Sequence, residues 1–351
     1  MKTLLHPRVV LLSIFLMVIC SLGAQDIHFS QYYNVPMNLN PALTGVFDGD
    51  MRFVGNFREQ WRNVPITYRT AYGSFETKFK SRNAKKGLPE NGYFSGGLLM
   101  NFDHAGDSRM GTIQIGLNGS YTHKLTETNY LTAGVQVSGN QRSFDTEKLT
   151  FGEQYNGKQF DSSLGPEPFN DKTAFYADFS VGANWNYRKK GKRTALNVGG
   201  ALYHINQPNK SFWDEEDVVL PARWSFYGIG IMELTSKFDV VLSAMGWYQD
   251  AYTQNLLTAA GRFHLDTRPT HQRAIQLAFS YRFNDGFGVS DALIPAAQFH
   301  VNSWIFGLSY DINISDFEVA TANLGGPELS VVYILKRVPT PEYCPTCPTY
   351  L

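Results

Sequence analysis

The sequence predicts an all-β transmembrane barrel of about 14 antiparallel strands, and three observations support this fold class. After residue 50, apolar and polar residues alternate with a period of two through most of the chain, as in strands with one apolar face. Aromatic residues make up 14% of the chain and charged residues only 18%, a balance that suits a surface facing lipid. The number of candidate strands is even, as expected of a bacterial barrel.

The charge balance excludes a surface built for nucleic acid. The 351 residues contain 31 Lys and Arg against 31 Asp and Glu, so there is no basic excess to neutralise phosphates. Beyond the N-terminus, no apolar run approaches the roughly 20 residues that a membrane helix needs. The sequence therefore also excludes a helical membrane protein.

Residues 1–24 have the layout of a secretory signal peptide. Basic residues precede an apolar stretch at residues 9–20, and small residues up to Ala24 offer a cleavage site before Gln25. Cys20 resembles a lipoprotein cysteine, but isoleucine stands before it where a small residue is expected. We therefore expect cleavage near Ala24 and an outer-membrane location.

Residues 25–49 interrupt the alternation before the first strand. They contain Pro36 and Pro41 among several asparagines, which predicts irregular structure with a short helical turn. Such a segment either folds into the lumen as a plug or lies below the barrel on the periplasmic side.

The alternation is clearest in two segments. Residues 112–122 place Ile, Leu and Tyr on one face and Thr, Gln, Asn and Ser on the other. Residues 175–188 alternate likewise, and at about 3.3 Å per residue this strand is long enough for a tilted membrane crossing. Similar patterns recur at residues 131–140, 275–284 and 304–313. We assign residues 50–338 to the barrel, with the apolar face toward lipid and the polar face toward a hydrated lumen.

Short and long connections alternate along the chain, with the long ones at residues 145–172 and 207–220. Short turns on one side and long loops on the other are typical of outer-membrane barrels, whose termini are both periplasmic. Rings near strand ends are interpreted as an interfacial girdle: Tyr121, Trp185, Tyr187, Tyr203, Trp247, Tyr248, Tyr281 and Phe283. A soluble two-sheet sandwich is the alternative, which strand length and girdle disfavour.

Residues 339–351 are expected to form a periplasmic tail. It holds Cys344 and Cys347, the only cysteines left once the signal peptide is removed, so disulfides cannot hold the fold together. In an oxidising periplasm this pair either closes a small disulfide loop or stays reduced in a mobile tail.

Several segments closely resemble one family. The resemblance begins at residues 25–33 and 36–45, the start of the mature chain, and continues through residues 58–61, 68–75, 307–313 and 328–333. It identifies the chain as a member of the PorP/SprF family, outer-membrane proteins of Bacteroidetes associated with type IX secretion. The family's usual ending is a short Cys-Pro element, which residues 344–348 resemble with a second cysteine added.

The resemblance implies a barrel that works with the type IX machinery. Its role would lie within the ring-associated outer-membrane assembly, or as the partner of a secreted surface adhesin with a type B C-terminal sorting domain. Neither role is enzymatic or needs a cofactor. The competing function is a FadL-like transport barrel for small hydrophobic molecules. A lipid hydrolase would need a Ser and a His brought together, and no local signature supports it.

The sequence offers no catalytic, cofactor-binding or metal-ligating pattern, since the eight histidines are spread singly. Its candidate residues are for partner binding: Tyr32, Tyr33, Asn38, Asn40, Pro41, Trp213, Cys344 and Cys347. Trp213 precedes four acidic residues in a long outer loop, and an exposed ring beside acids can anchor an interface. Arg58, Glu59, Arg62 and Arg69 at the first hairpin form either a lumenal network or a solvated face.

Overall fold

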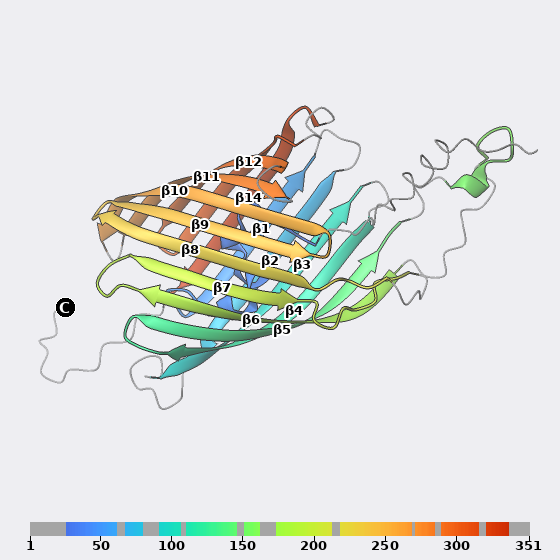
Figure 1. Cartoon of the computed structure of the whole chain (residues 1–351). Coiled ribbons are helices and arrows are strands. Elements are labelled where there is room, and N and C mark those ends of the chain that lie inside the picture. The colour runs from blue at the N-terminus through green and yellow to red at the C-terminus, as the bar shows by residue number, and fades with distance from the viewer. Residues whose placement is uncertain are drawn as a thin grey trace, which may run out of the picture.

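A computed structural model describes residues 26–61, 67–79, 91–106, 110–145, 151–161, 173–212, 218–268, 271–284, 289–315 and 321–336. In this part of the chain, fourteen antiparallel strands form one closed barrel (Figure 1). Each strand pairs with the next along the chain, and β14 closes the ring by pairing with β1. The predicted fold class is confirmed.

The strands are β1 (Met51–Gln60), β2 (Tyr68–Phe79), β3 (Gly92–Ala105), β4 (Met110–Lys124), β5 (Asn129–Ser143), β6 (Thr173–Arg188), β7 (Ala195–Tyr203), β8 (Arg223–Thr235), β9 (Phe238–Gln249), β10 (Tyr252–Arg268), β11 (His271–Asn284), β12 (Val289–Val301), β13 (Trp304–Asn313) and β14 (Leu324–Leu335). The short helices are η1 (Tyr32–Asn34), α2 (Pro36–Leu39), η2 (Pro41–Leu43) and η3 (Gly152–Gln154). In the described residues, no helix is both long and apolar enough to cross a membrane.

The outer face of the barrel is apolar and the inner face is polar. On β4, Leu117 is 66% exposed on the outside, whereas its neighbour Asn118 is 6% exposed on the inside. Large apolar side chains such as Val135, Phe179 and Leu277 are exposed in the same way on other strands. Soluble proteins seldom expose so much contiguous apolar surface, whereas an apolar outer face is typical of membrane barrels. The predicted division into an apolar outer face and a polar inner face is confirmed.

The barrel has two ends, which we name by what lies there. At the C-terminal mouth β1 begins and β14 ends, and most connections are short, such as residues 125–128 and 236–237. At the loop mouth lie the long connections at residues 144–172 and 204–222. The predicted alternation holds only in part. Residues 80–91 make a long connection at the C-terminal mouth, and the connections at residues 106–109, 250–251 and 285–288 are short ones at the loop mouth.

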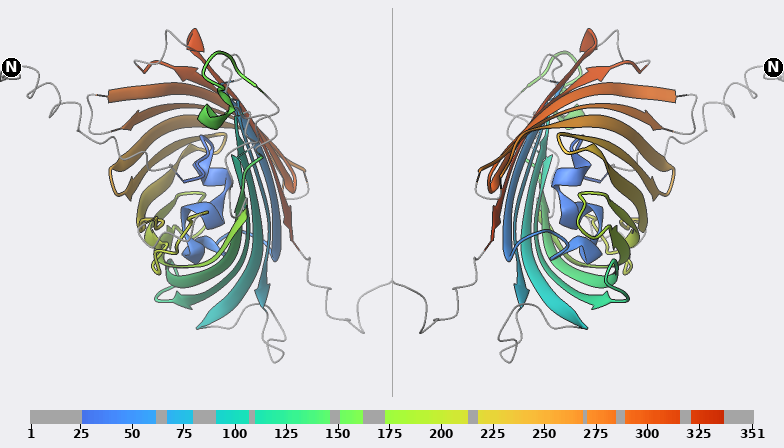
Figure 2. Two further views of the ribbon diagram at one scale, coloured as in Figure 1. Left: turned by 90° about the vertical axis from the view of Figure 1, so that its right-hand side faces the viewer. Right: turned by 90° about the vertical axis from the view of Figure 1, so that its left-hand side faces the viewer.

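The N-terminal segment, residues 26–49, lies inside the barrel. Figure 2 shows its short helices enclosed by the ring of strands. Its apolar side chains pack against two regions of the inner wall: Tyr32, Leu39 and Leu43 against Tyr227, Met245, Trp247, Leu256, Ala292 and Ile294, and Phe29, Val35 and Met37 against Val54, Tyr72, Leu99 and Val332. The sequence left open whether this segment lies in the lumen as a plug or below the barrel. In the structure it lies in the lumen as a plug. The polar wall behind it is largely buried rather than hydrated.

The segment runs the length of the lumen. Asp26 pairs with Arg223, the first residue of β8, at the loop mouth, and Asp48 pairs with Lys336, which follows β14, at the C-terminal mouth. The first and last described residues therefore lie at opposite mouths, whereas the sequence predicted both termini on one side. The reason is that the segment crosses the lumen before β1 begins.

The predicted aromatic girdle is only partly correct. Tyr121, Trp185 and Tyr248 are exposed on the outer face, as expected. Tyr203 and Trp247 are buried and point into the lumen, because each lies at an inward position of its strand. Both contact residues of the site described next.

Candidate functional site

Residues 26–49, which lie inside the barrel, are called the lumenal segment from here on. The centre of this segment is held by Asn40. Its side-chain amide donates to the carbonyl oxygens of Ala183 (2.9 Å) and Gly200 (3.1 Å), and its Oδ1 accepts from the Ala42 backbone N–H at 2.8 Å. The last of these bonds caps η2, because it satisfies one of the unpaired N–H groups at a helix start. Asn40 thus fixes the local turn and attaches it to the wall at once.

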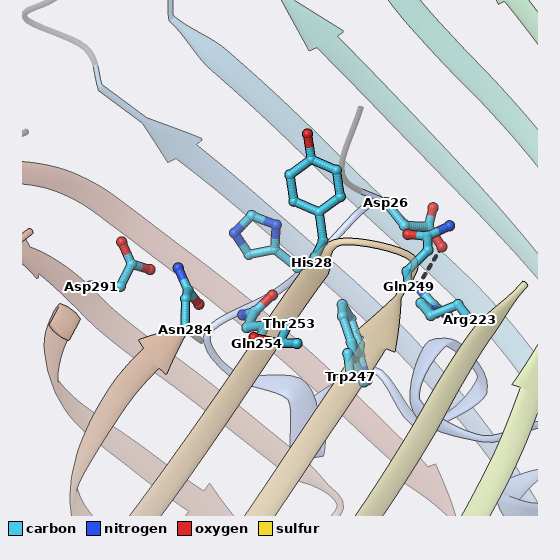
Figure 3. Close-up of a pocket in the computed structure, with 10 residues that line it drawn as sticks. Asp26, His28, Arg223, Trp247, Gln249, Thr253, Gln254, Asn284 and Asp291 are labelled. Carbon is cyan, nitrogen blue, oxygen red and sulfur yellow. Dashed lines mark hydrogen bonds and ion pairs between the residues drawn. The ribbon is translucent and has the colours of Figure 1, made fainter. Parts of the chain in front are cut away.

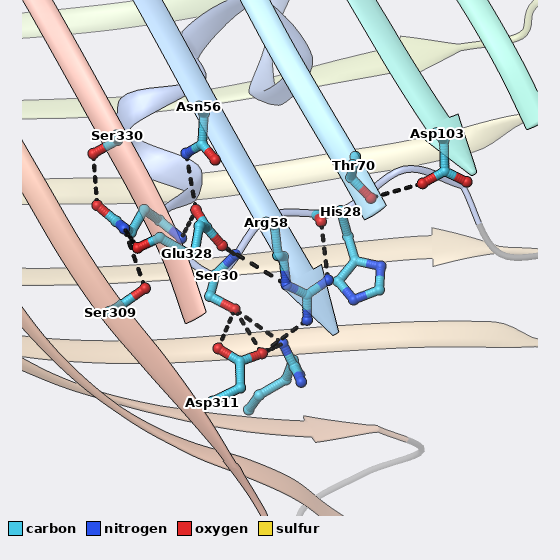
Figure 4. Close-up of polar contacts among 12 residues, drawn as sticks. His28, Ser30, Asn56, Arg58, Thr70, Asp103, Ser309, Asp311, Glu328 and Ser330 are labelled. Carbon is cyan, nitrogen blue, oxygen red and sulfur yellow. Dashed lines mark hydrogen bonds and ion pairs between the residues drawn. The ribbon is translucent and has the colours of Figure 1, made fainter. Parts of the chain in front are cut away.

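On the opposite side of the lumen, Ser30 and Gln31 are fixed by carboxylates from the wall (Figure 4). Their backbone N–H groups donate to the Glu328 carboxylate at 2.7 and 3.0 Å, and the Ser30 hydroxyl donates to Asp311 at 2.6 Å. Arg58 donates to the same Asp311 carboxylate at 2.8 Å, and Arg282 does so at 2.9 Å. All of these side chains are buried, so their charges are compensated by one another rather than by water.

The loop mouth carries a second charged cluster, around Asp26 (Figure 3). Arg223 donates to Asp26 at 2.5 Å, and its guanidinium lies 4.1 Å from the ring centroid of Tyr203 and 4.5 Å from that of Trp247. His204 lies 2.9 Å from the Asp26 carboxylate and, through its other ring nitrogen, 2.9 Å from that of Asp178. The start of the segment is therefore clamped at this mouth.

The two carboxylates around His204 change its protonation. Burial lowers the pKa of the imidazole, but Asp26 and Asp178 outweigh burial and raise the pKa above its usual value. The protonated form of His204 therefore strengthens the cluster.

Cavities remain between the segment and the wall of the barrel. A cavity of about 40 Å³ at the loop mouth is lined by Asp26, His28 and Asp291 among others, and Figure 3 shows these side chains around it. A larger cavity of about 220 Å³ lies in the C-terminal half of the lumen, beside Tyr33 and His300. In the part of the chain that the structure describes, no group of three or more His, Cys, Asp or Glu residues is placed to hold a metal ion.

The family model for the type IX secretion system membrane protein PorP/SprF matches residues 21–333. The chain belongs to this family. The matched range contains the lumenal segment and every strand of the barrel except the last residues of β14. No curated protein sequence matches the chain.

Solved structures with similar architecture are distant in sequence. The toluene transporter TbuX of Ralstonia pickettii is 9% identical, with 86% of this chain and 92% of that chain covered at a TM-score of 0.48. The monoaromatic hydrocarbon channel CymD is 10% identical, with 87% and 93% covered at 0.49. BamA of Haemophilus ducreyi lacking POTRA domains 1–3 is 10% identical, with 81% and 70% covered at 0.43. These similarities are too remote to bear on the function of this chain.

The segments that carry the resemblance to PorP/SprF proteins meet inside the barrel. Ser309 and Ser330 both bond the Gln31 side chain, and Arg58, Asp311 and Glu328 form the network below it (Figure 4). Gly307 is part of this arrangement, since a Cβ there would lie 2.3 Å from Gln31 Oε1 and 2.3 Å from Ser330 Oγ. The motifs of this PorP/SprF chain therefore include residues that hold the first part of the lumenal segment.

Most of the predicted partner-binding residues in the segment are buried in this PorP/SprF barrel. Tyr32 donates to Ser243 at 2.6 Å, and Asn38 exchanges two amide hydrogen bonds with Asn101. Asn40 and Pro41 pack against β5 and β6. Tyr33 is half-buried beside the larger cavity. Trp213, Cys344 and Cys347 lie outside the described residues.

The first hairpin divides between the two interpretations that the sequence left open. Arg58 belongs to the lumenal network, whereas Glu59 and Arg69 form an ion pair of 3.2 Å in which the arginine is exposed. Arg62 lies outside the described residues. Each alternative is therefore correct for part of the hairpin.

Sequence reasoning missed Asp26, His204, Arg223, Arg282, Asp311 and Glu328 as members of the site. The period-two pattern held a usable signal, because charged residues such as Arg282 and Glu328 fall at inward positions of membrane-spanning strands. A charge at such a position is costly unless it is paired, so it predicts a partner in the lumen. Which residue is the partner could not be read from the pattern.

Proposed function

We propose that this PorP/SprF barrel is a non-enzymatic binding component of type IX secretion. Its signal peptide is cleaved near Ala24, its loop mouth faces outward and its C-terminal mouth faces the periplasm. The loop mouth holds a secreted surface adhesin or its C-terminal sorting domain and supports export or retention of that protein. The C-terminal mouth contacts a component of the secretion machinery.

The observation that supports this proposal is the lumenal segment, which occupies the barrel from one mouth to the other. Asp26 is fixed to β8 at the loop mouth, Asn40 contacts β6 and β7 in the middle, and Lys336 holds Asp48 at the C-terminal mouth. A transported molecule would need the space that this segment fills. Binding at the two mouths leaves it in place.

The loop mouth offers exposed rings for such binding. Beyond the end of the barrel, residues 151–161 form a small hairpin closed by a bridge between Tyr155 and Phe160, which are 59% and 52% exposed. Figure 1 shows η3 of this hairpin beyond the strand ends. Aromatic side chains exposed in this way commonly serve as interface anchors.

The two long loops also touch each other. Phe144 packs edge-on against Phe212 with ring centroids 4.8 Å apart, and the Arg142 guanidinium lies 5.2 Å from the Phe212 ring. Phe212 directly precedes Trp213. The proposed anchor Trp213 therefore follows a residue of one long loop that contacts the other long loop. In this proposal Trp213 contacts the adhesin, Cys344 and Cys347 contact the periplasmic partner, and Tyr32, Asn38, Asn40 and Pro41 act by holding the segment.

The proposal is tested by removing the rings while keeping the barrel. Tyr155→Ala combined with Phe160→Ala, and separately Trp213→Ala, should leave the barrel inserted but reduce surface display of its cargo, since such anchors commonly contribute about 2 kcal/mol or more. Phe94→Ala, at an exposed ring on the lipid face, is the control and should display cargo normally. Normal display in all variants, together with lost uptake of a small apolar compound, would instead favour the transport function.

A further inference from the structure

We propose that a cavity at the C-terminal mouth is a binding site for a peptide carboxylate, and that its occupant is Glu342 in the tail after β14. The proposal does not depend on the identity of any secretion partner. It concerns a part of the barrel that the clusters described above do not use.

The cavity lies between the end of the lumenal segment and β2 to β6, and its volume is about 220 Å³. Phe47 and Asp48 line it from the segment, and Lys78, Tyr93 and Arg188 line it from the wall. The strand ends that contribute to it all lie at the C-terminal mouth. The cavity is therefore reached from the same side on which the tail begins.

In the described part of the chain, the cavity has two cations that form no direct ion pair, although Asp48 and Asp50 lie near enough to act on the charge of Lys78. Lys78 donates to the Phe47 carbonyl oxygen, and its ammonium group lies 4.7 Å from the Phe47 ring centroid and 5.2 Å from that of Tyr93. Among the described residues, neither Lys78 nor Arg188 forms a side-chain ion pair with a carboxylate. Lys78 is partly buried and gains from a carboxylate that also accepts its hydrogen bonds, and the exposed Arg188 adds a second positive charge. A carboxylate is therefore the fitting ligand.

The carboxylate of Asp48 does not fill this role. Asp48 lines the cavity, but its Oδ2 pairs with Lys336 at 2.7 Å. The pair has a second consequence, because Lys336 is the last described residue of the chain. Because Asp48 lines the cavity, the pair places the starting point of residues 337–351 near its rim.

Glu342 is the only acidic residue in residues 337–351. It follows Lys336 by six positions, and six residues of extended chain span at most about 20 Å. Pro339 and Pro341 lie between the two and favour an extended chain. A ligand tethered this closely is present at an effective concentration of the order of millimolar, so a modest affinity suffices to keep the site occupied.

The test is cross-linking of the full-length protein in detergent with a water-soluble carbodiimide, which joins a carboxylate to an amine only when the two are in contact. Mass spectrometry should find a peptide in which Lys78 is joined to Glu342. Glu342→Gln removes the carboxylate, and Lys78→Arg keeps the charge but removes the amine, so both should abolish this product. Lys124→Arg, at another lysine of the same mouth, should leave it unchanged.

A second measurement does not rely on the cross-linking chemistry. Chymotrypsin cleavage after Tyr343 should be about tenfold faster in Glu342→Gln and in Arg188→Gln than in the parent, because the docked tail is protected. Glu127→Gln, at an exposed carboxylate of the same mouth, should cleave like the parent. The proposal is overturned if Glu342 joins only Lys336 or Lys124, or if the cleavage rates are all equal.

Discussion

Gly134 on β5 and Gly182 on β6 are direct register partners, and the absence of side chains at both creates the seat for the lumenal segment. A Cβ on Gly182 would lie 1.9 Å from Asn40 Oδ1, and one on Gly134 would lie 2.5 Å from the Ala42 backbone nitrogen. Both glycines are needed because residues 40–42 of the segment lie directly against the backbone of β5 and β6, which leaves no space for a Cβ.

Gly182→Val should therefore displace the segment from its seat. We expect a loss of about 1 to 3 kcal/mol in unfolding free energy from overpacking, and a larger ion conductance in a planar bilayer because the lumen is less completely filled. Gly139→Val is the matched control, since Gly139 is on the outer face of β5 with open space around it. Identical conductance in the two variants would contradict a plug held at this seat.

The lipid face gives a second prediction. Leu117→Arg should cost about 2 to 4 kcal/mol in folding into vesicles, because it places a charge in the hydrocarbon region. Leu117→Met keeps an apolar side chain of similar volume and should fold like the parent. Asn118→Arg on the inner face should also have a measurable cost, because Asn118 is buried rather than in contact with a hydrated lumen. A Leu117→Arg variant as stable as Leu117→Met would mean that this face does not contact lipid.

The ionic network gives a third. Asp311→Asn leaves the buried Arg58 and Arg282 without their shared counter-ion, so we expect a loss of about 3 to 5 kcal/mol in chemical denaturation. Arg69→Met at the exposed pair with Glu59 should cost well under about 1 kcal/mol. Similar losses in both variants would show that burial does not increase the contribution of the network to the free energy of unfolding.

The fourth prediction concerns pH. The folded-state pKa of His204 is raised, since Asp26 and Asp178 outweigh burial, so its contribution to stability is fully present below the unfolded value of about 6.5. That contribution is lost as pH rises through the higher folded-state value. The difference in denaturation midpoint between the parent and His204→Gln should thus be larger at pH 5.5 than well above neutrality. An equal difference at the two pH values would contradict this role of His204.

The fifth concerns the tail. If Cys344 and Cys347 close a disulfide loop in the periplasm, a thiol reagent should label them in purified protein only after reduction. Full labelling without reductant would exclude the disulfide. Serine at both positions should leave barrel insertion unchanged, because residues 339–351 follow the last strand.

The strands could be predicted from sequence because the membrane imposes a strict alternation. The segment predicted at residues 304–313 has the bounds of β13, and that at residues 112–122 lies within β4. Lipid selects an apolar side chain at every second position, so the period is visible without knowledge of any neighbour.

The candidate site could be predicted only in part. Asp311 and Arg58 are 253 positions apart, and their contact depends on the closure of the ring between β1 and β14. The inward positions of Tyr203 and Trp247 depend in the same way on strand register, and an aromatic residue near a strand end fits either face. Pairwise contacts in a lumen leave no periodic signal along the chain.

The bonds between the lumenal segment and β14 restrict the order in which the molecule assembles. Gln31 bonds Glu328 and Asn34 bonds Ser330, so a segment that is synthesised before all of the barrel strands contacts β14, the last of them. If the ring closed before the segment was in place, the segment would have to be threaded through a finished pore. We therefore expect the segment to bind the sheet while it is still open. The segment would then serve as the template on which β14 pairs with β1 and closes the ring.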